Sequence, residues 1–492
     1  MARVQDILKH PNRLFIAGQW CSPVSDSRIR VVAPATEEVT MEVAEAVEAD
    51  VDRAVEAARR AFDEGPWPSL SPLRRAEYLR AIGQAIRERA DEIAQIWPNE
   101  MGILAPLARS SALTAAEAFE DYAALGNSFS FEERHRPRRG GAEGLLVREP
   151  VGVVGAIIPW NAPLTLLTHK VAPALLAGCT VVLKASPEAP GIPYLIAEIV
   201  EAVGLPPGVV NMLTADRGAS EHLVRHPGVD KISFTGSSAA GRRIASICGE
   251  RIARYTLELG GKSAAVILDD YDIEAAAQSI AGTAIYLTGQ ACSSLTRIVV
   301  TRSRHDRMVE ALSAQFDAVR VGDPFDPVAQ MGPVAMRRQR DRIEALMAQG
   351  QAEGAILARG GGRPAHLDRG FFIEPTVFGH VGNDTVLARE EIFGPVLSVI
   401  PADNEEDAIA IANDTIYGLN NSVFTNDVDR AYAIGRRLRS GTVGHNVWRT
   451  DLGLSFGGFK QSGVGREGIL EGLLPYLESK TIILESTPSH IA

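Results

Sequence analysis

From residue 151 onward, short apolar runs alternate with segments of helical pattern, and this alternation constrains the fold most strongly. The apolar runs are short and rich in β-branched residues, which favours buried strands over helices. Alternating strands and helices are typical of a doubly wound parallel sheet, whose ligands bind where the strands end at their carboxyl side. We predict strands at residues 151–158, 180–184, 209–213 and 231–234, and helices at residues 164–177, 192–203 and 239–248.

The alternation restarts after residue 263, so a second α/β domain is expected, with the boundary near Gly260 and Gly261. A chain of 492 residues is too long for one core, which supports this division. Residues 145–148 and 481–484 fit neither sheet and predict edge strands that a partner or charge must cover. Further strands are expected at residues 264–268 and 297–301, and further helices at residues 273–286 and 305–316.

Before residue 151 the pattern is helical. Residues 45–62 have apolar positions on one helical face. Ser71 followed by Pro72 predicts the start of the next helix, with serine as its cap and proline in its first turn. The buried stripe of that helix is expected to comprise Leu79, Ile82, Ile86 and Ile93.

Composition excludes several classes of protein. The net charge of −11 argues against nucleic acid as a partner, and the basic stretch at residues 134–139 is interpreted as a solvated turn. We find no apolar run long enough to span a membrane and no apolar core of a signal peptide at the N-terminus. The four cysteines lack paired spacing, which predicts neither a disulfide framework nor a metal site. Free thiols fit the reducing cytoplasm. The four residues are Cys21, Cys179, Cys248 and Cys292.

Two segments carry residues suited to covalent catalysis. Cys292 lies in TGQACSSLTR (288–297), where glycine and serine suit an exposed, tightly turned loop. Glu258 lies in TLELGGKS (256–263), and its apolar neighbours would desolvate the carboxylate and raise its pKa toward that of a general base. Each residue also has an ordinary interpretation, as an inert buried thiol and as a surface glutamate on an edge strand.

Two turns between strands and helices have further chemical potential. Asn161 in PWNAP (159–163) could donate its side-chain amide to an oxyanion, or it could merely cap the following helix. The turn GSSAAG (236–241) precedes a helix whose N–H groups could bind phosphate. Its spacing is not the ordinary dinucleotide fingerprint, so this motif is weak by itself.

Together these segments resemble the signature of the NAD(P)-dependent aldehyde dehydrogenase superfamily. The spacing of residues 236–241 is the form used in that superfamily, and EEIFGPV (390–396) and FGGFKQSGVGRE (456–467) strengthen the likeness. The resemblance covers nearly the whole chain, from IAGQW (16–20) to YLESKT (476–481).

The resemblance implies an α/β fold with a Rossmann-type cofactor domain, a second α/β catalytic domain and a small β extension for oligomerisation. The cofactor domain would comprise residues 1–126 and 151–260, the catalytic domain residues 261–469, and the bridging strands residues 127–150 and 470–492. A cytoplasmic homodimer or homotetramer is expected, with no nucleic acid, membrane or metal as a partner.

The implied reaction is the oxidation of an aldehyde to its carboxylic acid with NAD(P)⁺. Cys292 would form a thiohemiacetal and then a thioester, Glu258 would activate water for hydrolysis, and Asn161 would stabilise the oxyanion. By the same resemblance the cofactor contacts are Ile157, Trp160, Lys184, Ser186, Glu188, Phe234, Gly236, Ser237, Leu259, Glu391 and Phe393. The substrate tunnel would be lined by Ala162, Leu166, His169, Ala291, Ser293 and Phe456.

Two departures from the family pattern bear on specificity. Many NAD-preferring members have a glutamate three residues after the lysine, where this chain has Pro187, with Glu188 one place later. NADP thus stays possible, but NAD is favoured because no arginine or second lysine is obvious nearby in the sequence. His169 stands where the family often has an aromatic residue, which predicts a fairly open tunnel of mixed polarity.

Three other functions remain as alternatives. An acylating dehydrogenase would transfer the acyl group to coenzyme A or phosphate, but such relatives generally lack the base that Glu258 provides. A cofactor-free thiol hydrolase would pair Cys292 with His169 or His445 and would leave the glycine turns unexplained. A structural protein without catalysis is disfavoured because the thiol, the carboxylate and the amide are all present.

Overall fold

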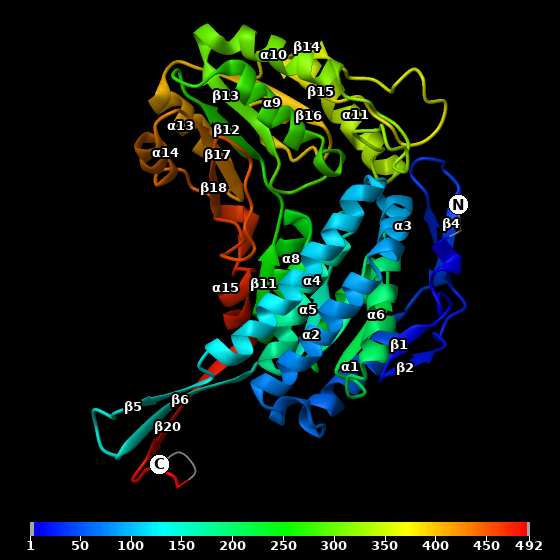
Figure 1. The fold of residues 1–492 in the computed structure, drawn as a ribbon, viewed down its shortest axis with the longest axis vertical. Coiled ribbons are helices and arrows are strands. Elements are labelled where there is room, and N and C mark those ends of the chain that lie inside the picture. The colour runs from blue at the N-terminus through cyan, green and yellow to red at the C-terminus, as the bar shows by residue number, and fades with distance from the viewer. Residues whose placement is uncertain (1–3, 490–492) are drawn as a thin grey trace.

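The structure is a computed structural model that describes residues 4–489. In this part of the chain the strands form an eight-stranded, a seven-stranded, a three-stranded and a two-stranded sheet. Figure 1 shows the first two sheets in separate lobes, with the three-stranded sheet projecting from the body. No helix within these residues is long and apolar enough to cross a membrane.

The larger sheet has the strand order β19-β11-β10-β7-β8-β9-β1-β2. Its central strands are parallel, and the direction of winding reverses between β7 and β10, where Ile157 pairs with Phe234. A ligand crevice is expected at such a switch point, at the carboxyl ends of the strands. The strands are β1 (Leu14–Ile16), β2 (Gln19–Cys21), β7 (Val153–Ile157), β8 (Thr180–Ala185), β9 (Val210–Thr214), β10 (Lys231–Thr235), β11 (Arg254–Glu258) and β19 (Gly463–Val464).

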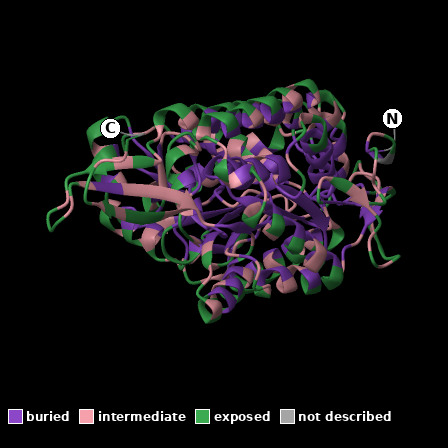
Figure 2. Cartoon of the chain, turned by 90° about the horizontal axis from the view of Figure 1, so that it is seen from below, coloured by how far each residue is buried: buried purple, intermediate pink, exposed green. Residues whose placement is uncertain are grey.

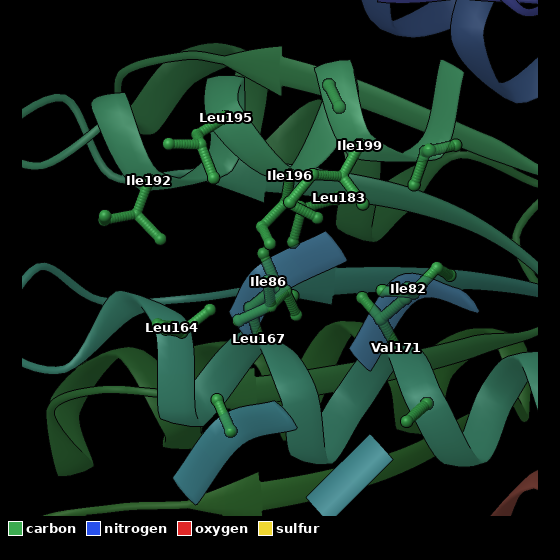
Figure 3. Packing of buried hydrophobic residues seen from close by; sticks show 14 of the residues in the cluster. Ile82, Ile86, Leu164, Leu167, Val171, Leu183, Ile192, Leu195, Ile196 and Ile199 are labelled. Atoms are coloured by element: carbon green, nitrogen blue, oxygen red, sulfur yellow. The ribbon is translucent and has the colours of Figure 1, made fainter. Parts of the chain in front are cut away.

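Helices cover both faces of this sheet, because alternate residues of its strands point to opposite sides. Val154 and Ala156 of β7 belong to one apolar cluster with α2 to α6, whereas Val153 and Ile157 belong to another with α1, α7 and α8. Figure 3 shows side chains of α2, α5 and α6 meeting over β8 in the first cluster. The helices are α1 (Glu48–Asp63), α2 (Pro72–Glu88), α3 (Ala90–Met101), α4 (Ala105–Ser128), α5 (Pro163–Ala177), α6 (Gly191–Val203), α7 (Arg217–Arg225) and α8 (Ser238–Arg251).

The predicted cap at Ser71 is confirmed, since its side chain accepts a hydrogen bond from the Arg74 N–H group. The predicted buried stripe, however, is split between two helices. α2 ends at Glu88, and Ile93 belongs to α3, which begins after Arg89. Arg89 has non-helical backbone angles, and an apolar periodicity that continues across one such residue does not reveal the break.

The second sheet has the order β14-β15-β16-β13-β12-β17-β18 and is parallel except for β14. Its strands are β12 (Ser263–Ile267), β13 (Leu295–Thr301), β14 (Ile356–Arg359), β15 (Thr376–Gly379), β16 (Val396–Ala402), β17 (Asn420–Phe424) and β18 (Thr442–His445). Its helices are α9 (Ile273–Ala284), α10 (His305–Asp317), α11 (Arg337–Ala352), α12 (Val386–Arg389), α13 (Glu405–Asn413) and α14 (Val428–Gly435).

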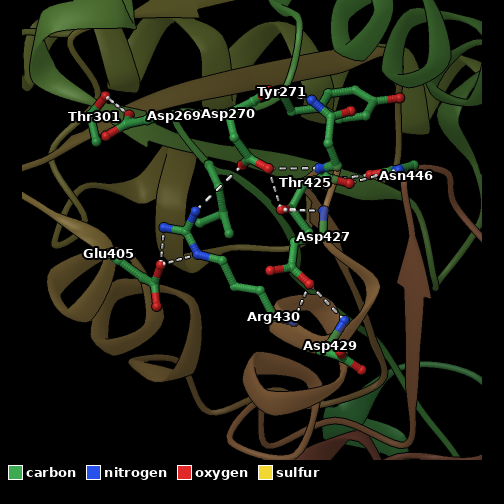
Figure 4. Close-up of polar contacts among 12 residues, drawn as sticks. Asp269, Asp270, Tyr271, Thr301, Glu405, Thr425, Asp427, Asp429, Arg430 and Asn446 are labelled. Atoms are coloured by element: carbon green, nitrogen blue, oxygen red, sulfur yellow. Dashed lines mark hydrogen bonds and ion pairs between the residues drawn. The ribbon is translucent and has the colours of Figure 1, made fainter.

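Polar contacts join the loops that follow β12 and β17 (Figure 4). Asp270 accepts hydrogen bonds from the Thr425 hydroxyl at 2.7 Å and from the Asn426 N–H group at 2.8 Å. Arg430 of α14 pairs with both Asp270 and Glu405. These contacts hold neighbouring strand ends together at one edge of the second sheet.

The three-stranded sheet has the order β20-β6-β5 and is antiparallel. It is formed by β5 (Glu132–His135), β6 (Glu143–Pro150) and β20 (Leu477–Leu484). The expectation that residues 145–148 form an edge strand is wrong, because β5 and β20 pair with β6 on both sides. The short polar sequence of β5 lacked the apolar alternation that marks a strand. Figure 2 shows buried residues concentrated in the body, whereas the projecting strands are largely intermediate or exposed.

Two short elements complete the arrangement. β3 (Arg28–Val32) and β4 (Val39–Ala44) form the two-stranded sheet. β19 pairs antiparallel with β11, so residues 463–464 join the larger sheet although the sequence assigned them to the second domain. The helix α15 (Ile469–Leu473) then packs against α5 and α4. The chain after β18 therefore returns to the first lobe and closes over its strand ends.

Candidate active site

A cavity of about 520 Å³ is bordered by loops from both lobes. The first lobe contributes residues after β7 and β10 and the face of α5, and the second contributes the loop before β13 and residues around Glu391. The six residues expected in the substrate tunnel all line this cavity: Ala162, Leu166, His169, Ala291, Ser293 and Phe456. The sequence did not indicate several further lining residues, among them Tyr286, Trp448, Thr450 and Leu452, because no distinctive motif marks them.

Cys292 lies on the cavity wall and is a half-buried free thiol. The preceding turn has left-handed backbone angles at Leu287, Thr288 and Gly289, with φ of 49°, 55° and 71°. A Cβ atom at Gly289 would lie 2.2 Å from the carbonyl carbon of Gly394, so only glycine allows the loop to pack against the 390–396 segment. This turn thus holds the thiol at the junction of the lobes.

The thiol is the resting form of Cys292. Burial raises its pKa above the ordinary value, and the carboxylates of Glu391 and Glu258 raise it further. A hydrogen bond from the Cys292 backbone N–H group acts in the opposite direction, but burial and negative charge outweigh it.

Asn161 lines the cavity and is buried. Its Nδ2 group donates a hydrogen bond of 3.0 Å to the carbonyl oxygen of Gln290, two residues before Cys292. The N-cap of α5 is Ala162 rather than Asn161, so the interpretation as a helix cap is wrong. The amide is therefore held against the cysteine loop.

Glu258 ends β11 and is only 2% exposed, which excludes the interpretation as a surface residue. It lies behind the cavity wall that its neighbours Leu259 and Gly260 form. Neither carboxyl oxygen has a hydrogen-bond partner among residues 4–489. Burial raises its pKa well above the usual range, and Glu467 adds to that rise, while Lys170 and Arg466 oppose it. A Cβ at Gly457 would lie 2.7 Å from Oε1, so glycine makes room for the carboxyl group.

A buried ion pair that the sequence did not reveal lies next to Glu258. Lys170 of α5 pairs with Glu467, and both side chains are buried. Glu467 also lines the cavity and influences the pKa of Glu258. The glycine-rich segment 456–467 drew attention to this region, but 297 residues separate the two partners.

The residues expected to contact a cofactor fall into two groups. Six line the cavity at the strand switch point: Trp160, Gly236, Ser237, Leu259, Glu391 and Phe393. The rings of Trp160 and Phe393 meet edge-on with centroids 5.4 Å apart. Ser237 caps α8, whose first-turn N–H groups form a favourable site for phosphate. The other five lie outside the lining: Ile157, Lys184, Ser186, Glu188 and Phe234.

Among these outer residues, Lys184 is the next-to-last residue of β8, where it pairs with Ile157, and its burial lowers its pKa to about 8. Glu188 accepts a hydrogen bond from Ser186 and pairs with Arg338 of α11. The expectation that no arginine lies near this end of the crevice is therefore wrong. Arg338 is 150 positions away in the sequence, and only the fold brings it to Glu188.

His305, Asp306 and His380 form a separate group whose ligand atoms lie within 4.8 Å of one another. His305 Nδ1 faces Asp306 at 2.7 Å, and its Nε2 accepts the His380 N–H group at 2.9 Å. Both ring nitrogens of His305 are thus engaged by the protein. This arrangement fits a structural contact between α10 and the residue after β15.

The fold and the cavity define the class of protein: two α/β lobes with a crevice at the strand switch point and a free cysteine on its wall. The sequence model of the Aldehyde dehydrogenase family matches residues 20–482, and the chain belongs to that family. It is 43% identical over 474 residues to a geranial dehydrogenase of Castellaniella defragrans, covering 96% of this chain and 98% of the relative.

Two further comparisons agree with this assignment. A 3-succinoylsemialdehyde-pyridine dehydrogenase of a Pseudomonas species is 42% identical, with 95% of this chain and 98% of that protein covered. An aldehyde dehydrogenase of Mycobacterium tuberculosis, solved in complex with NAD⁺, superposes with a TM-score of 0.94 at 44% identity, covering 96% and 98% of the chains.

Proposed function

We propose that this protein oxidises an aldehyde to the carboxylic acid by the hydrolytic route, with NAD as the electron acceptor. One observation carries the proposal. The Cys292 thiol and the Asn161 amide border one cavity, and the partner-free Glu258 carboxyl group lies close enough to influence the thiol. Such a set suits nucleophilic attack, oxyanion stabilisation and activation of water.

The crevice residues fit NAD. The start of α8 offers N–H groups for a pyrophosphate, Lys184 and Glu188 offer polar groups for a ribose, and Trp160 and Phe393 form an apolar wall for the nicotinamide. When bound, NAD supplies the hydride acceptor and a positively charged ring beside the thiol. A nearby positive charge favours the thiolate and offsets the burial that holds Cys292 protonated.

The chain's own residues then act in two stages. The Cys292 proton leaves to water in the cavity, and the sulfur attacks the aldehyde carbon to form a thiohemiacetal. Asn161 donates to the developing oxyanion, and one such donor typically lowers a barrier by ~3–4 kcal/mol. After oxidation to the thioester, the Glu258 side chain turns toward the cavity and takes a proton from water. The hydroxide adds to the thioester, and the carbon–sulfur bond breaks.

Product analysis tests the hydrolytic route. With aldehyde and NAD we expect one carboxylic acid per NADH, and the same yield with coenzyme A or phosphate added. The physical reason is that this chain has a buried base, Glu258, that can turn toward the cavity and activate water, whereas acylating relatives generally lack this base. Mass spectrometry of the products provides the measurement. Formation of an acyl-CoA or acyl phosphate as the main product would show that water is not the acceptor.

The thiol-hydrolase alternative finds less support. His169 bonds Tyr122, and His445 bonds the carbonyl oxygen of Thr425, so both candidate histidines have other partners. Failure of NAD and NADP to quench the tryptophan fluorescence would revive this alternative.

The cofactor preference is a separate question. Arg338 could neutralise Glu188 near a 2′-phosphate, so the proposal includes NADP use beside NAD. Comparison of kcat/KM for the two cofactors measures this preference.

We place the cofactor domain at residues 1–126 and 151–260, the catalytic domain at 261–469 and the bridging strands at 127–150 and 470–492.

The described cysteines are all free, which supports a reducing cytoplasm. The outer edge of β20 has no partner strand among the described residues, and Ile483 on this strand is exposed. Both features support a homodimer or homotetramer through the three-stranded sheet.

Light scattering after size-exclusion chromatography tests the assembly. We expect twice or four times the chain mass of 52.8 kDa, because an unpaired strand edge with exposed apolar residues is stabilised by pairing. Ile483→Asp should shift the population toward smaller species, while Val24→Asp, an exposed position outside the three-stranded sheet, serves as the control. A wild-type monomer across micromolar concentrations would contradict the proposed assembly.

A further inference from the structure

His169 is a buried histidine on the wall of the substrate cavity. It is 3% exposed and lies on α5, the helix that follows Asn161. Its Nδ1 atom is 3.2 Å from the hydroxyl oxygen of Tyr122, which is fully buried on α4. Among the described residues the Nε2 atom has no hydrogen-bond partner, although the ring lines the cavity. An unpartnered ring nitrogen of a buried side chain on a cavity wall is available to a ligand.

The neighbours of Tyr122 determine which nitrogen of His169 carries the proton. Among the described residues, the hydrogen bond of the Tyr122 hydroxyl group is with His169 Nδ1. The hydroxyl hydrogen then needs an acceptor, because a buried hydroxyl group is costly to leave unpaired. His169 Nδ1 is the acceptor within reach, so we assign the tautomer with hydrogen on Nε2. His169 therefore offers an N–H donor to the cavity.

The histidine is a neutral donor. Burial, and to a lesser degree the charge of the neighbouring Lys170, lower the pKa of His169 to about 3. A neutral N–H group binds an uncharged oxygen without the strong preference for anions that an imidazolium would have. The chemistry at this point of the cavity is thus that of an ether, a carbonyl or a hydroxyl oxygen.

Among the described lining residues, none at the substrate end carries a positive charge that could receive a carboxylate. The two arginines among the described lining residues, Arg217 and Arg342, belong to the cofactor end. Arg217 begins α7 directly after β9, and Arg342 donates to the carbonyl oxygen of Glu391. The lining residues also include Leu166, Tyr286, Trp448 and Leu452, which suit an apolar or aromatic body.

The position of His169 on α5 determines how far the bound substrate oxygen lies from the reacting aldehyde carbon. It lies six residues after Pro163, the first residue of α5, which corresponds to ~9 Å along the helix axis. Asn161 and Cys292 lie at the start of this helix, so the aldehyde carbon reacts there. An oxygen that reaches His169 is at the far end of an extended substrate.

We propose that His169 is a specificity-determining residue that donates its Nε2–H group to an uncharged oxygen at the distal end of an apolar or aromatic aldehyde. Tyr122 is a positioning residue that holds the ring and its tautomer. This inference rests on the proposed aldehyde oxidation and adds the substrate class.

Two aldehydes of nearly equal shape test the donor. 4-Methoxycinnamaldehyde carries the distal oxygen, and 4-ethylcinnamaldehyde replaces it with a methylene group. We compare the ratio of their kcat/KM values in the wild type and in variants, so that intrinsic reactivity cancels. In the double variant His169→Leu with Tyr122→Phe, which leaves no unpaired hydroxyl, the methoxy preference should fall about tenfold, mainly through KM. His169→Gln keeps an N–H donor and should retain most of the preference.

The outcomes separate the two proposals. A ratio within twofold of the wild type in the folded double variant would overturn the role of His169. Tyr122→Phe alone should lower the preference less than the double variant, and it provides the test if the double variant does not fold. A 4-carboxylate analogue that is preferred over the ethyl compound would also overturn the inference. If no aldehyde yields NADH, the proposed function fails instead.

Discussion

Cys292→Ala is expected to lower kcat for aldehyde oxidation by on the order of 10⁴-fold or more, because removal of a covalent nucleophile abolishes the pathway rather than weakening one contact. The other described cysteines cannot replace it. Cys179 and Cys248 are buried in apolar clusters, and Cys21 lies on the edge strand β2. The measurement is the initial rate of NADH formation with saturating aldehyde and cofactor.

Two controls distinguish loss of the nucleophile from loss of the fold. Cys21→Ala changes a thiol of similar half-burial outside the cavity and should keep kcat within about twofold of the wild type, as is usual for substitutions away from a site. Cofactor quenching of tryptophan fluorescence should persist in Cys292→Ala, since Trp160 is unchanged. Residual activity above a tenth of the wild type would exclude Cys292 as the nucleophile.

Glu258→Gln should preserve the first turnover and abolish the following ones. A rapid burst of about one NADH per active site is expected, followed by a steady rate lowered ~10²–10⁴-fold, the range typical of general-base removal. Glutamine has nearly the same shape but cannot take the proton of water. Loss of the negative charge also removes one influence that raises the pKa of Cys292, so the thiol should react at least as readily.

The wild-type steady rate has a predictable pH dependence. A general base works only when it is deprotonated, and burial raises the pKa of Glu258 well above that of an exposed glutamate. The rate should therefore rise with pH at values above those at which an exposed glutamate titrates and level off above the raised pKa, and this rise should vanish in Glu258→Gln. Stopped-flow absorbance records burst and steady rate together. A steady rate unchanged by the substitution would reject Glu258 as the base.

The alternation of strands and helices from residue 151 allowed six parallel strands to be predicted, β7 to β10, β12 and β13, because each is a compact apolar run between helices. The parallel strands β11 and β15 to β18 were not predicted. Elements without that pattern were missed. The polar strand β5 is one example, and the break between α2 and α3 at Arg89 is another. Apolar periodicity reports burial, and it is silent where a strand is solvated or a helix turns without a breaker residue.

The site shows the same division. Cys292, Glu258 and Asn161 could be identified because each lies in a motif that is contiguous in the sequence. The contacts that tune them join distant segments: Lys170 with Glu467, Arg338 with Glu188, and Tyr122 with His169. Such pairs carry no local spacing, so only the folded chain reveals them. The rise in the thiol's pKa likewise depends on carboxylates from two other segments.

Intact-protein mass spectrometry of Glu258→Gln, quenched in acid after mixing with aldehyde and NAD, tests the central claim most directly. The account predicts a mass increase equal to one acyl group, located by peptide mapping on Cys292 and absent when NAD is omitted. An acyl group on another residue, or an unmodified protein after a full burst of NADH, would contradict it.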